Sequence, residues 1–135
     1  MLVIKPIQDK EQQRQLVAEC GAAYDESAFA YAATECSDDG ETVLYVIGAC
    51  QFAMHDGRGE ISLLRCRPGI EDDEAMMIMA RAAASFLFRC GIRYLIMDAK
   101  AADLKLITAL GFTSNAGGEY ELDIFRYYST PCHER

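Results

Sequence analysis

The sequence has few residues that bind metal ions and no motif that would gather them. It contains 2 histidines and 6 cysteines, and no two cysteines are spaced as a Cys-x-x-Cys pair. Structural zinc sites usually take their ligands from such closely spaced pairs. We therefore predict no metal site. Most of the cysteines have apolar neighbours and are expected to be reduced and buried, whereas Cys132, in a polar stretch, is expected to be exposed.

Basic residues are scarce as well. The 135 residues include 13 lysines and arginines against 21 aspartates and glutamates, so the formal net charge at pH 7 is −8. Nucleic acids and anionic membranes bind proteins through basic surfaces. We therefore expect neither as a partner. An unidentified small molecule is the expected partner, and the long-range field of the acidic chain favours a cationic or amine ligand.

The sequence also lacks an apolar run long enough to span a bilayer. The segment from Met1 to Pro6 lacks the basic, apolar and small-residue regions of a signal peptide, which predicts a cytoplasmic protein. Apolar residues make up 51% of the chain, enough for a substantial core, and the length corresponds to about one domain. We expect a single domain at residues 1–128 and a polar C-terminal tail at residues 129–135.

Hydrophobic periodicity and turn signals predict an alternation of strands and helices. Strands are expected at residues 2–7, 42–54, 60–67, 92–97 and 120–124, and helices between Asp9 and Gly21 and at about residues 26–33, 72–89 and 101–110. The longest helix begins among acidic residues and is followed by Gly91, as the helix dipole and a C-terminal glycine favour. Gly48 is expected to bend its strand or create a bulge there. These elements indicate an α/β protein.

The order of these elements resembles the GNAT (N-acetyltransferase-like) superfamily over nearly the whole chain. The most specific pieces are Gly91-Ile92-Arg93-Tyr94-Leu95, Ala109-Leu110-Gly111-Phe112 and, at the end of the expected central strand, Arg65-Cys66-Arg67-Pro68. The resemblance implies a single GNAT-like acyl-CoA N-acyltransferase fold of the α/β (α+β) class. Its central mixed, mostly antiparallel sheet would be flanked by about four helices. The resemblance also makes a homodimer possible, and the sequence does not decide the oligomeric state.

The positions that would bind the cofactor keep little of the family's pattern. Those that match the family's acyl-CoA strand and loop are Leu64, Cys66, Glu71, Asp72, Asp73, Glu74 and Met76. The acidic run within them puts carboxylates where the family places a polyanion, although acids at a helix N-terminus also satisfy the helix dipole. The family's frequent general acid, a tyrosine, falls on Ile107, and its asparagine at the start of the same helix falls on Lys100.

Candidates for the chemistry of an enzyme remain. By the resemblance, Glu60 is the best-placed carboxylate for a general base, and His55 lies in the preceding hairpin. Tyr127 could supply a proton in place of the missing tyrosine. Each of the three could equally be an ordinary surface or packed residue.

Two further arrangements involve the central strands. A thiol mechanism would pair Cys50 or Cys66 with His55 as its base. Arg65 and Arg67 alternate along the central strand and could hold a carboxylate or phosphate, but we expect them to pair with the acids at residues 71–74.

The sequence is therefore compatible with two functions. The chain is expected to be a GNAT-like protein with a degenerate acyl-CoA site: a non-catalytic, ligand-binding or regulatory module without a cofactor. The alternative is an atypical acetyl-CoA-dependent N-acetyltransferase acting on a small amine or a protein amine, with acetyl-CoA or another acyl-CoA as cofactor. In the family the central strand splays from its neighbour. An open gap beside residues 63–67 would favour catalysis, and a gap filled by side chains would exclude it.

Overall fold

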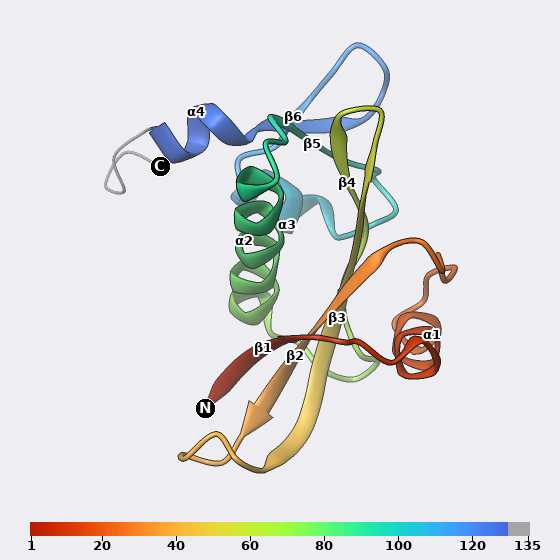
Figure 1. The fold of residues 1–135 in the computed structure, drawn as a ribbon, viewed down its shortest axis with the longest axis vertical. Coiled ribbons are helices and arrows are strands. Elements are labelled where there is room, and N and C mark those ends of the chain that lie inside the picture. Colours follow the sequence, from red (N-terminus) through yellow and green to blue (C-terminus); the bar gives the residue numbers. More distant parts are fainter. Residues whose placement is uncertain (130–135) are drawn as a thin grey trace.

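In the computed structural model, which describes residues 1–129, a seven-stranded sheet is flanked by helices (Figure 1). The elements in chain order are β1 (Leu2–Pro6), α1 (Lys10–Glu19), β2 (Phe29–Cys36), β3 (Val43–His55), β4 (Arg58–Cys66), α2 (Asp73–Arg89), β5 (Tyr94–Met97), α3 (Leu104–Ala109), β6 (Thr113–Ser114), β7 (Tyr120–Asp123) and α4 (Ile124–Ser129).

The sheet has the strand order β1-β2-β3-β4-β5-β7-β6. Only β4 and β5 are parallel, and every other neighbouring pair is antiparallel. This mixed, mostly antiparallel sheet with helices on both faces confirms the fold class expected from the sequence. The parallel pair is short, because it joins Gly59–Ile61 to Leu95–Met97 and no further residues. Beyond Ile61 the two strands diverge, which leaves a fork in the sheet.

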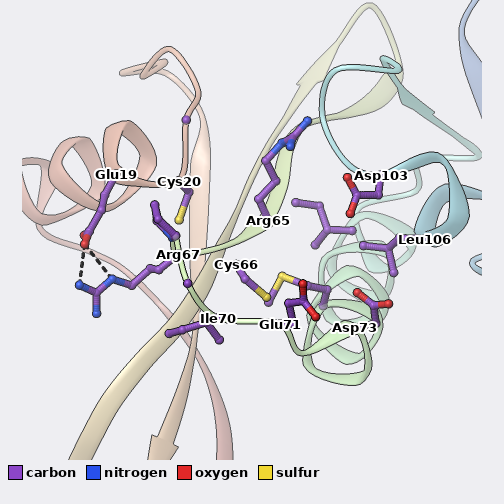
Figure 2. Close-up of a pocket in the computed structure, with 15 residues that line it drawn as sticks. Glu19, Cys20, Arg65, Cys66, Arg67, Ile70, Glu71, Asp73, Asp103 and Leu106 are labelled. Atoms are coloured by element: carbon purple, nitrogen blue, oxygen red, sulfur yellow. Dashed lines mark hydrogen bonds and ion pairs between the residues drawn. The ribbon is translucent and has the colours of Figure 1, made fainter.

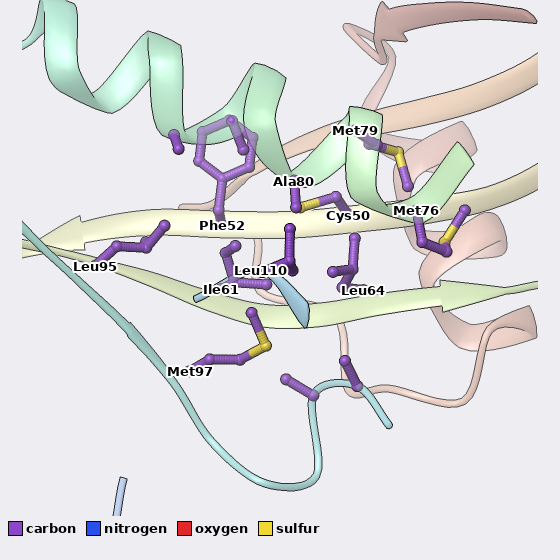
Figure 3. Packing of buried hydrophobic residues seen from close by; sticks show 14 of the residues in the cluster. Cys50, Phe52, Ile61, Leu64, Met76, Met79, Ala80, Leu95, Met97 and Leu110 are labelled. Carbon is purple, nitrogen blue, oxygen red and sulfur yellow. The ribbon is translucent and has the colours of Figure 1, made fainter. Parts of the chain in front are cut away.

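The core lies mainly between the sheet and α2. Figure 3 shows Met76 and Met79 of α2 packed over Cys50 and Phe52 of β3, and each of these four side chains is at most 2% exposed. A smaller cluster on the opposite face packs α1 against the alternate residues of the same strands; it consists of Val17, Cys20, Ala49 and Leu63. Successive side chains of a strand point to opposite faces, so β3 and β4 are buried on both sides.

The longest helix was predicted closely. α2 spans Asp73–Arg89, and the carboxylate of Asp72 accepts a hydrogen bond from the N–H of Ala75 at 3.0 Å, as an N-cap residue does. The chain leaves the helix through Cys90 and Gly91, and Gly91 has a φ of 83°, which favours glycine. Both ends of the helix are therefore encoded locally.

The helix predicted at residues 26–33 is wrong. Residues 29–36 form β2, which is paired with β1 along one edge and with β3 along the other. Ala30, Ala32 and Ala33 are buried in this strand. Alanine favours helices when a segment is considered alone, but hydrogen bonding to two neighbouring strands outweighs that preference.

The predicted C-terminal strand is also shorter than expected. It ends at Asp123, and Ile124, which is fully buried, begins the unpredicted helix α4. Of the tail expected at residues 129–135, all but Ser129 lies outside the described residues.

Gly48 lies where β3 is irregular, in agreement with the sequence. The register with β2 runs from Ala33 opposite Gly48 to Thr34 opposite Val46, so one residue of β3 is left over. A Cβ atom at Gly48 would lie 2.3 Å from the carbonyl oxygen of Arg65 on β4. The close approach of β3 and β4 therefore requires glycine at this position.

Five free cysteines are described. Cys20, Cys36 and Cys50 are buried as expected, Cys66 is half-buried and Cys90 is exposed. Cys132 lies outside the described residues. Among the helices of residues 1–129, none combines the length and the apolar character needed to cross a membrane.

Candidate ligand groove beside strand β4

An open groove of about 650 Å³ runs beside the C-terminal half of β4 (Figure 2). The end of α1, the β4–α2 loop, the first turn of α2 and the start of α3 surround it. The residues that line it are Glu19, Cys20, Gly21, Leu64, Arg65, Cys66, Arg67, Pro68, Gly69, Ile70, Glu71, Asp73, Met76, Asp103 and Leu106. The fork between β4 and β5 thus opens into a cavity large enough for a small molecule.

The apex of the fork is closed by the chain itself. The N–H of Leu64 donates a hydrogen bond of 2.8 Å to the carbonyl oxygen of Ala101, in the loop between β5 and α3. Ala101 and Ala102 are each 1% exposed. The gap beside residues 63–67 is therefore filled near Leu64 and open farther along, next to Cys66 and Arg67.

The two arginines of this region do not pair with the acids at residues 71–74, and that expectation is wrong. Arg67 donates through Nε and Nη2 to Oε1 of Glu19, at 2.8 and 2.5 Å. Arg65 donates through Nη2 to the carbonyl oxygen of Lys100 at 2.7 Å. Strand alternation explains the difference for Arg65, which shares a face of β4 with Leu63, the face that packs against α1. Arg67 follows directly after the strand and meets the end of α1.

Three carboxylates line the groove and have no cationic partner among the residues that the structure describes. Within residues 1–129, no ion pair joins Glu71, Asp73 or Asp103 to a lysine or arginine. Figure 2 shows all three on the side of the groove away from the Glu19–Arg67 pair. This side of the groove is consequently negative and repels anions. No three His, Cys, Asp or Glu side chains of the described residues gather closely enough to hold a metal ion.

Only some of the predicted cofactor positions line the groove. Five of the seven line the groove, namely Leu64, Cys66, Glu71, Asp73 and Met76. Asp72 instead caps its own helix, and Glu74 is exposed outside the groove lining. Met76 is 2% exposed, so its side chain belongs more to the core than to the groove.

The start of α2 still offers main-chain donors. The N–H groups of residues 71–74 have no hydrogen-bond acceptor among residues 1–129, as is usual in the first turn of a helix. Nearby, the Cys66 thiol donates weakly to the carbonyl oxygen of Asp72 at 3.8 Å, and burial raises the pKa of this thiol. Ile107, where the family has its tyrosine, is fully buried in the core of the sheet and α2.

The three predicted catalytic residues lie away from the groove lining. Glu60 is half-buried on β4, opposite Ile96 of β5, His55 is exposed at the end of β3, and the Tyr127 ring lies in α4. The structure brings none of them together with another at the groove, and their roles stay predictions.

The proposed thiol–imidazole pairs are not formed either. Cys50 is fully buried, and burial raises the pKa of its thiol. His55 lies five residues farther along β3, about 16 Å away at the usual rise of a strand. Cys66 lies at the opposite end of β4 from Arg58, the partner of His55 in the sheet. The structure therefore separates each thiol from the imidazole.

Several lining residues were missed by the sequence reasoning. Glu19, Gly21, Asp103 and Leu106 come from the end of α1 and the start of α3, far in sequence from β4. No local pattern distinguishes them from ordinary helix-end residues. Only the folded arrangement of α1 and α3 around the fork identifies them.

Sequence comparisons give no relative: no family model matches the chain, and no curated protein is similar enough to be matched. Solved structures are similar in fold. An acetyltransferase of the GNAT family from Brucella melitensis, in complex with acetyl-CoA, aligns with a TM-score of 0.63 and 16% identity, over 91% of this chain and 88% of that one. The ribosomal-protein-S18-alanine N-acetyltransferase from Escherichia coli aligns with a TM-score of 0.64 and 12% identity, over 92% and 94%. An IAA acetyltransferase from Bacillus cereus aligns with a TM-score of 0.63 and 16% identity, over 86% and 79%. This chain therefore has the fold of the GNAT acetyltransferases.

Proposed function

We propose that this chain is a ligand-binding or regulatory module that uses the GNAT fold without transferring acyl groups from coenzyme A. The observation that carries the proposal is the charge of the groove. Glu71, Asp73 and Asp103 line it without ion-pair partners among residues 1–129. If the cofactor's pyrophosphate binds at this helix end, as the GNAT resemblance leads us to expect, coenzyme A would bring its negative charges to these carboxylates.

The energetic balance is unfavourable for such an anion. Glu71, Asp73 and Asp103 are exposed, so two like charges 4 Å apart repel here by between about 1 kcal/mol, as in water, and about 4 kcal/mol, at an effective dielectric constant near 20. A neutral hydrogen bond contributes about 1 kcal/mol, so several such repulsions together outweigh a few hydrogen bonds. The nearby cations are already engaged, since Arg67 is bound to Glu19 and Arg65 to the carbonyl of Lys100, and each would have to leave its partner to meet an anion. A neutral or cationic small molecule suits the same lining better.

The acyl end of the groove supports the same proposal. The Leu64 N–H already donates to Ala101, so it is engaged where the strand would meet an acyl carbonyl. Ile107 is buried and aliphatic, so it cannot donate a proton to a leaving thiolate.

The test measures cofactor binding by calorimetry. We expect no heat of binding for the wild type with coenzyme A or acetyl-CoA, even at millimolar concentration. The variant Glu71→Gln/Asp73→Asn/Asp103→Asn should bind coenzyme A at least about tenfold more tightly, since one removed repulsion of about 1.4 kcal/mol is sufficient.

A matched control removes three charges elsewhere. Glu26, Asp38 and Glu41 are exposed and lie outside the groove lining. Glu26→Gln/Asp38→Asn/Glu41→Gln makes the net charge less negative by the same amount and should bind as weakly as the wild type. Micromolar binding by the wild type, or equal gains in both triple variants, would contradict the proposal.

A second function is favoured by a different observation. The groove is open beside Cys66. The N–H groups of residues 71–74 have no hydrogen-bond acceptor among the described residues. Both features suit an atypical acetyl-CoA-dependent N-acetyltransferase acting on a small amine or a protein amine. Glu60 would then be its base, with His55 or Tyr127 as further candidates.

An acetyl-transfer assay with a panel of amines separates the two functions. Release of coenzyme A by the wild type would reject the non-catalytic proposal. Glu60→Gln should then abolish that activity, while Glu121→Gln should not. Glu121 is a matched control because Glu60 and Glu121 are paired with the same residue, Ile96, from opposite sides. A homodimer and a cytoplasmic location stay predictions, to be checked by sedimentation and cell fractionation.

A further inference from the structure

Part of the segment that follows β5 lies against β4, because Ala101 and Ala102 are buried whereas residues 98–100 and 103 are exposed. Ala101 is 1% exposed although it belongs to a loop, and loops usually run over the surface. Two hydrogen bonds fasten the segment. The N–H of Leu64 donates to the carbonyl oxygen of Ala101 at 2.8 Å, and the Arg65 guanidinium donates to the carbonyl oxygen of Lys100 at 2.7 Å. We refer to residues 98–103 as the latch.

The latch stands at the fork of the sheet. β4 and β5 are paired only as far as Ile61 and Met97, and the N–H of Leu64 points into the gap beyond. A buried main-chain N–H needs an acceptor, which can come from the chain, from water or from a ligand. Here Ala101 supplies it. The latch therefore competes with any ligand group that would use this donor.

The latch also has its own internal structure. Oδ1 of Asp98 accepts the N–H of Lys100 at 2.7 Å, and the carbonyl oxygen of Asp98 accepts the N–H of Ala101 at 3.0 Å. These bonds form a compact turn, and Ala101 and Ala102 pack at the edge of the main core cluster. Within residues 1–129, Arg65 is the only side chain of β4 that forms a hydrogen bond with this turn, and it is half-exposed.

We propose that the latch is a conformational switch that closes and opens the groove beside Leu64. With the latch closed, the carbonyl of Ala101 occupies the N–H of Leu64. With the latch lifted, that N–H is available to a hydrogen-bond acceptor of a bound ligand, and Arg65 sets the balance between the two states. The consequence for binding rests on the proposed ligand groove, whereas the opening of the latch does not.

Amide hydrogen exchange of the ligand-free protein, followed by NMR, tests the switch. Arg65→Ala should speed the exchange of the Leu64 N–H about tenfold, which corresponds to about 1.4 kcal/mol. The N–H of Arg67, at the same end of β4, donates to Ile47 of β3 at 2.8 Å and should keep its wild-type rate. Arg58→Ala removes the same charge at the other end of β4, which lies outside the groove lining, and should change neither rate.

A second variant acts on the latch without touching β4. Asp98→Ala removes the acceptor of the Lys100 N–H, and it should also speed exchange at Leu64 while leaving the N–H of Arg67 unchanged. If Arg65→Ala fails to fold, this variant decides alone. Exchange at Leu64 that stays at the wild-type rate, or that rises together with exchange at Arg67, would overturn the proposal. Because no ligand is present, the result does not depend on what the groove binds.

Discussion

Arg67, just after β4, donates from both Nε and Nη2 to a single carboxylate oxygen of Glu19, at the end of α1. This ion pair joins the first helix to the rim of the groove and engages a cation that could otherwise meet an anion there. Both side chains are more than a third exposed, at 35% for Arg67 and 43% for Glu19. The pair is therefore expected to contribute less than about 1 kcal/mol to stability.

Releasing Arg67 should alter the anion affinity of the groove. We expect Glu19→Gln to raise the affinity for inorganic pyrophosphate several-fold by calorimetry, because it removes one negative charge and frees one positive charge. Glu11→Gln removes a charge from the same helix, where Glu11 pairs with Arg14, and should leave the affinity unchanged. Equal affinities for pyrophosphate in Glu19→Gln and Glu11→Gln would show that Arg67 does not face the binding site.

Gly48 should tolerate no side chain. A Cβ atom there would lie 2.3 Å from the carbonyl oxygen of Arg65 and 2.8 Å from the Cα of Cys66, both main-chain atoms that cannot move independently. Gly48→Ala should lower the free energy of unfolding by about 1–3 kcal/mol in urea titration. At Gly117 the nearest contact of a Cβ is 3.4 Å, to a side-chain atom, so Gly117→Ala should change stability by less than about 0.5 kcal/mol. Similar losses at the two glycines would contradict this account.

The two aspartates that precede α2 and α3 should behave differently. Asp72 accepts the N–H of Ala75 at 3.0 Å, whereas the side chain of Asp103 makes no capping hydrogen bond. Asp72→Ala should therefore cost about 1 kcal/mol of stability, and Asp103→Ala less than about 0.5 kcal/mol. Asp72→Asn should restore most of the loss, since asparagine caps nearly as well. Thermal unfolding of the three variants measures the difference.

The cysteines should react with thiol reagents according to their burial. Cys90 is exposed and should be labelled rapidly at pH 8, as read by mass spectrometry of its peptide. Cys50 should be protected until the protein unfolds, because it is buried and burial raises the pKa of its thiol. Fast labelling of Cys50 in the folded protein would show that β3 opens far more readily than its packing implies.

Cys20 should make the protein sensitive to alkali. Burial, and secondarily Glu19, raises the pKa of its thiol to about 11. An unfolded cysteine ionises near pH 8.5, so the folded state holds this proton more tightly. The resulting stability is present below about pH 8.5 and is lost as the pH rises toward 11. Cys20→Ala should flatten the fall of stability over this range in urea titrations, and an unchanged slope would refute the assignment.

The sequence indicated most reliably those elements whose ends are encoded locally. α2 has its cap at Asp72 and its terminating Gly91, and the Leu110-Gly111-Phe112 step marks the passage from α3 toward β6. Such signals lie within a few residues of the feature they specify. They were enough to place the elements in order and, through the family resemblance, to anticipate the fold. Leu64 and Cys66, predicted from that resemblance, line the groove, and their binding of a cofactor stays a prediction.

The remainder depends on contacts between distant segments. Residues 26–33 were predicted to form a helix, but residues 29–36 form a strand because β1 and β3 pair with it on both sides. The partners of Arg65 and Arg67 depend on which face of β4 meets α1, and the sequence of β4 alone does not specify that face. The groove likewise requires α1 and α3 to meet around the fork, and their residues carry no local mark of it.

The short pairing between Gly59–Ile61 and Leu95–Met97 also has a mechanical consequence. These residues form the only ladder that joins strands β1–β4 to strands β5–β7 in the described sheet, and the hydrogen bond from Leu64 to Ala101 extends that joint across the fork. A molecule that takes the place of Ala101 would shorten the joint and make it more compliant. Binding in the groove beside Leu64 would then lower the stiffness of the sheet at this joint. The two halves of the sheet would move more freely against each other when a ligand is bound there.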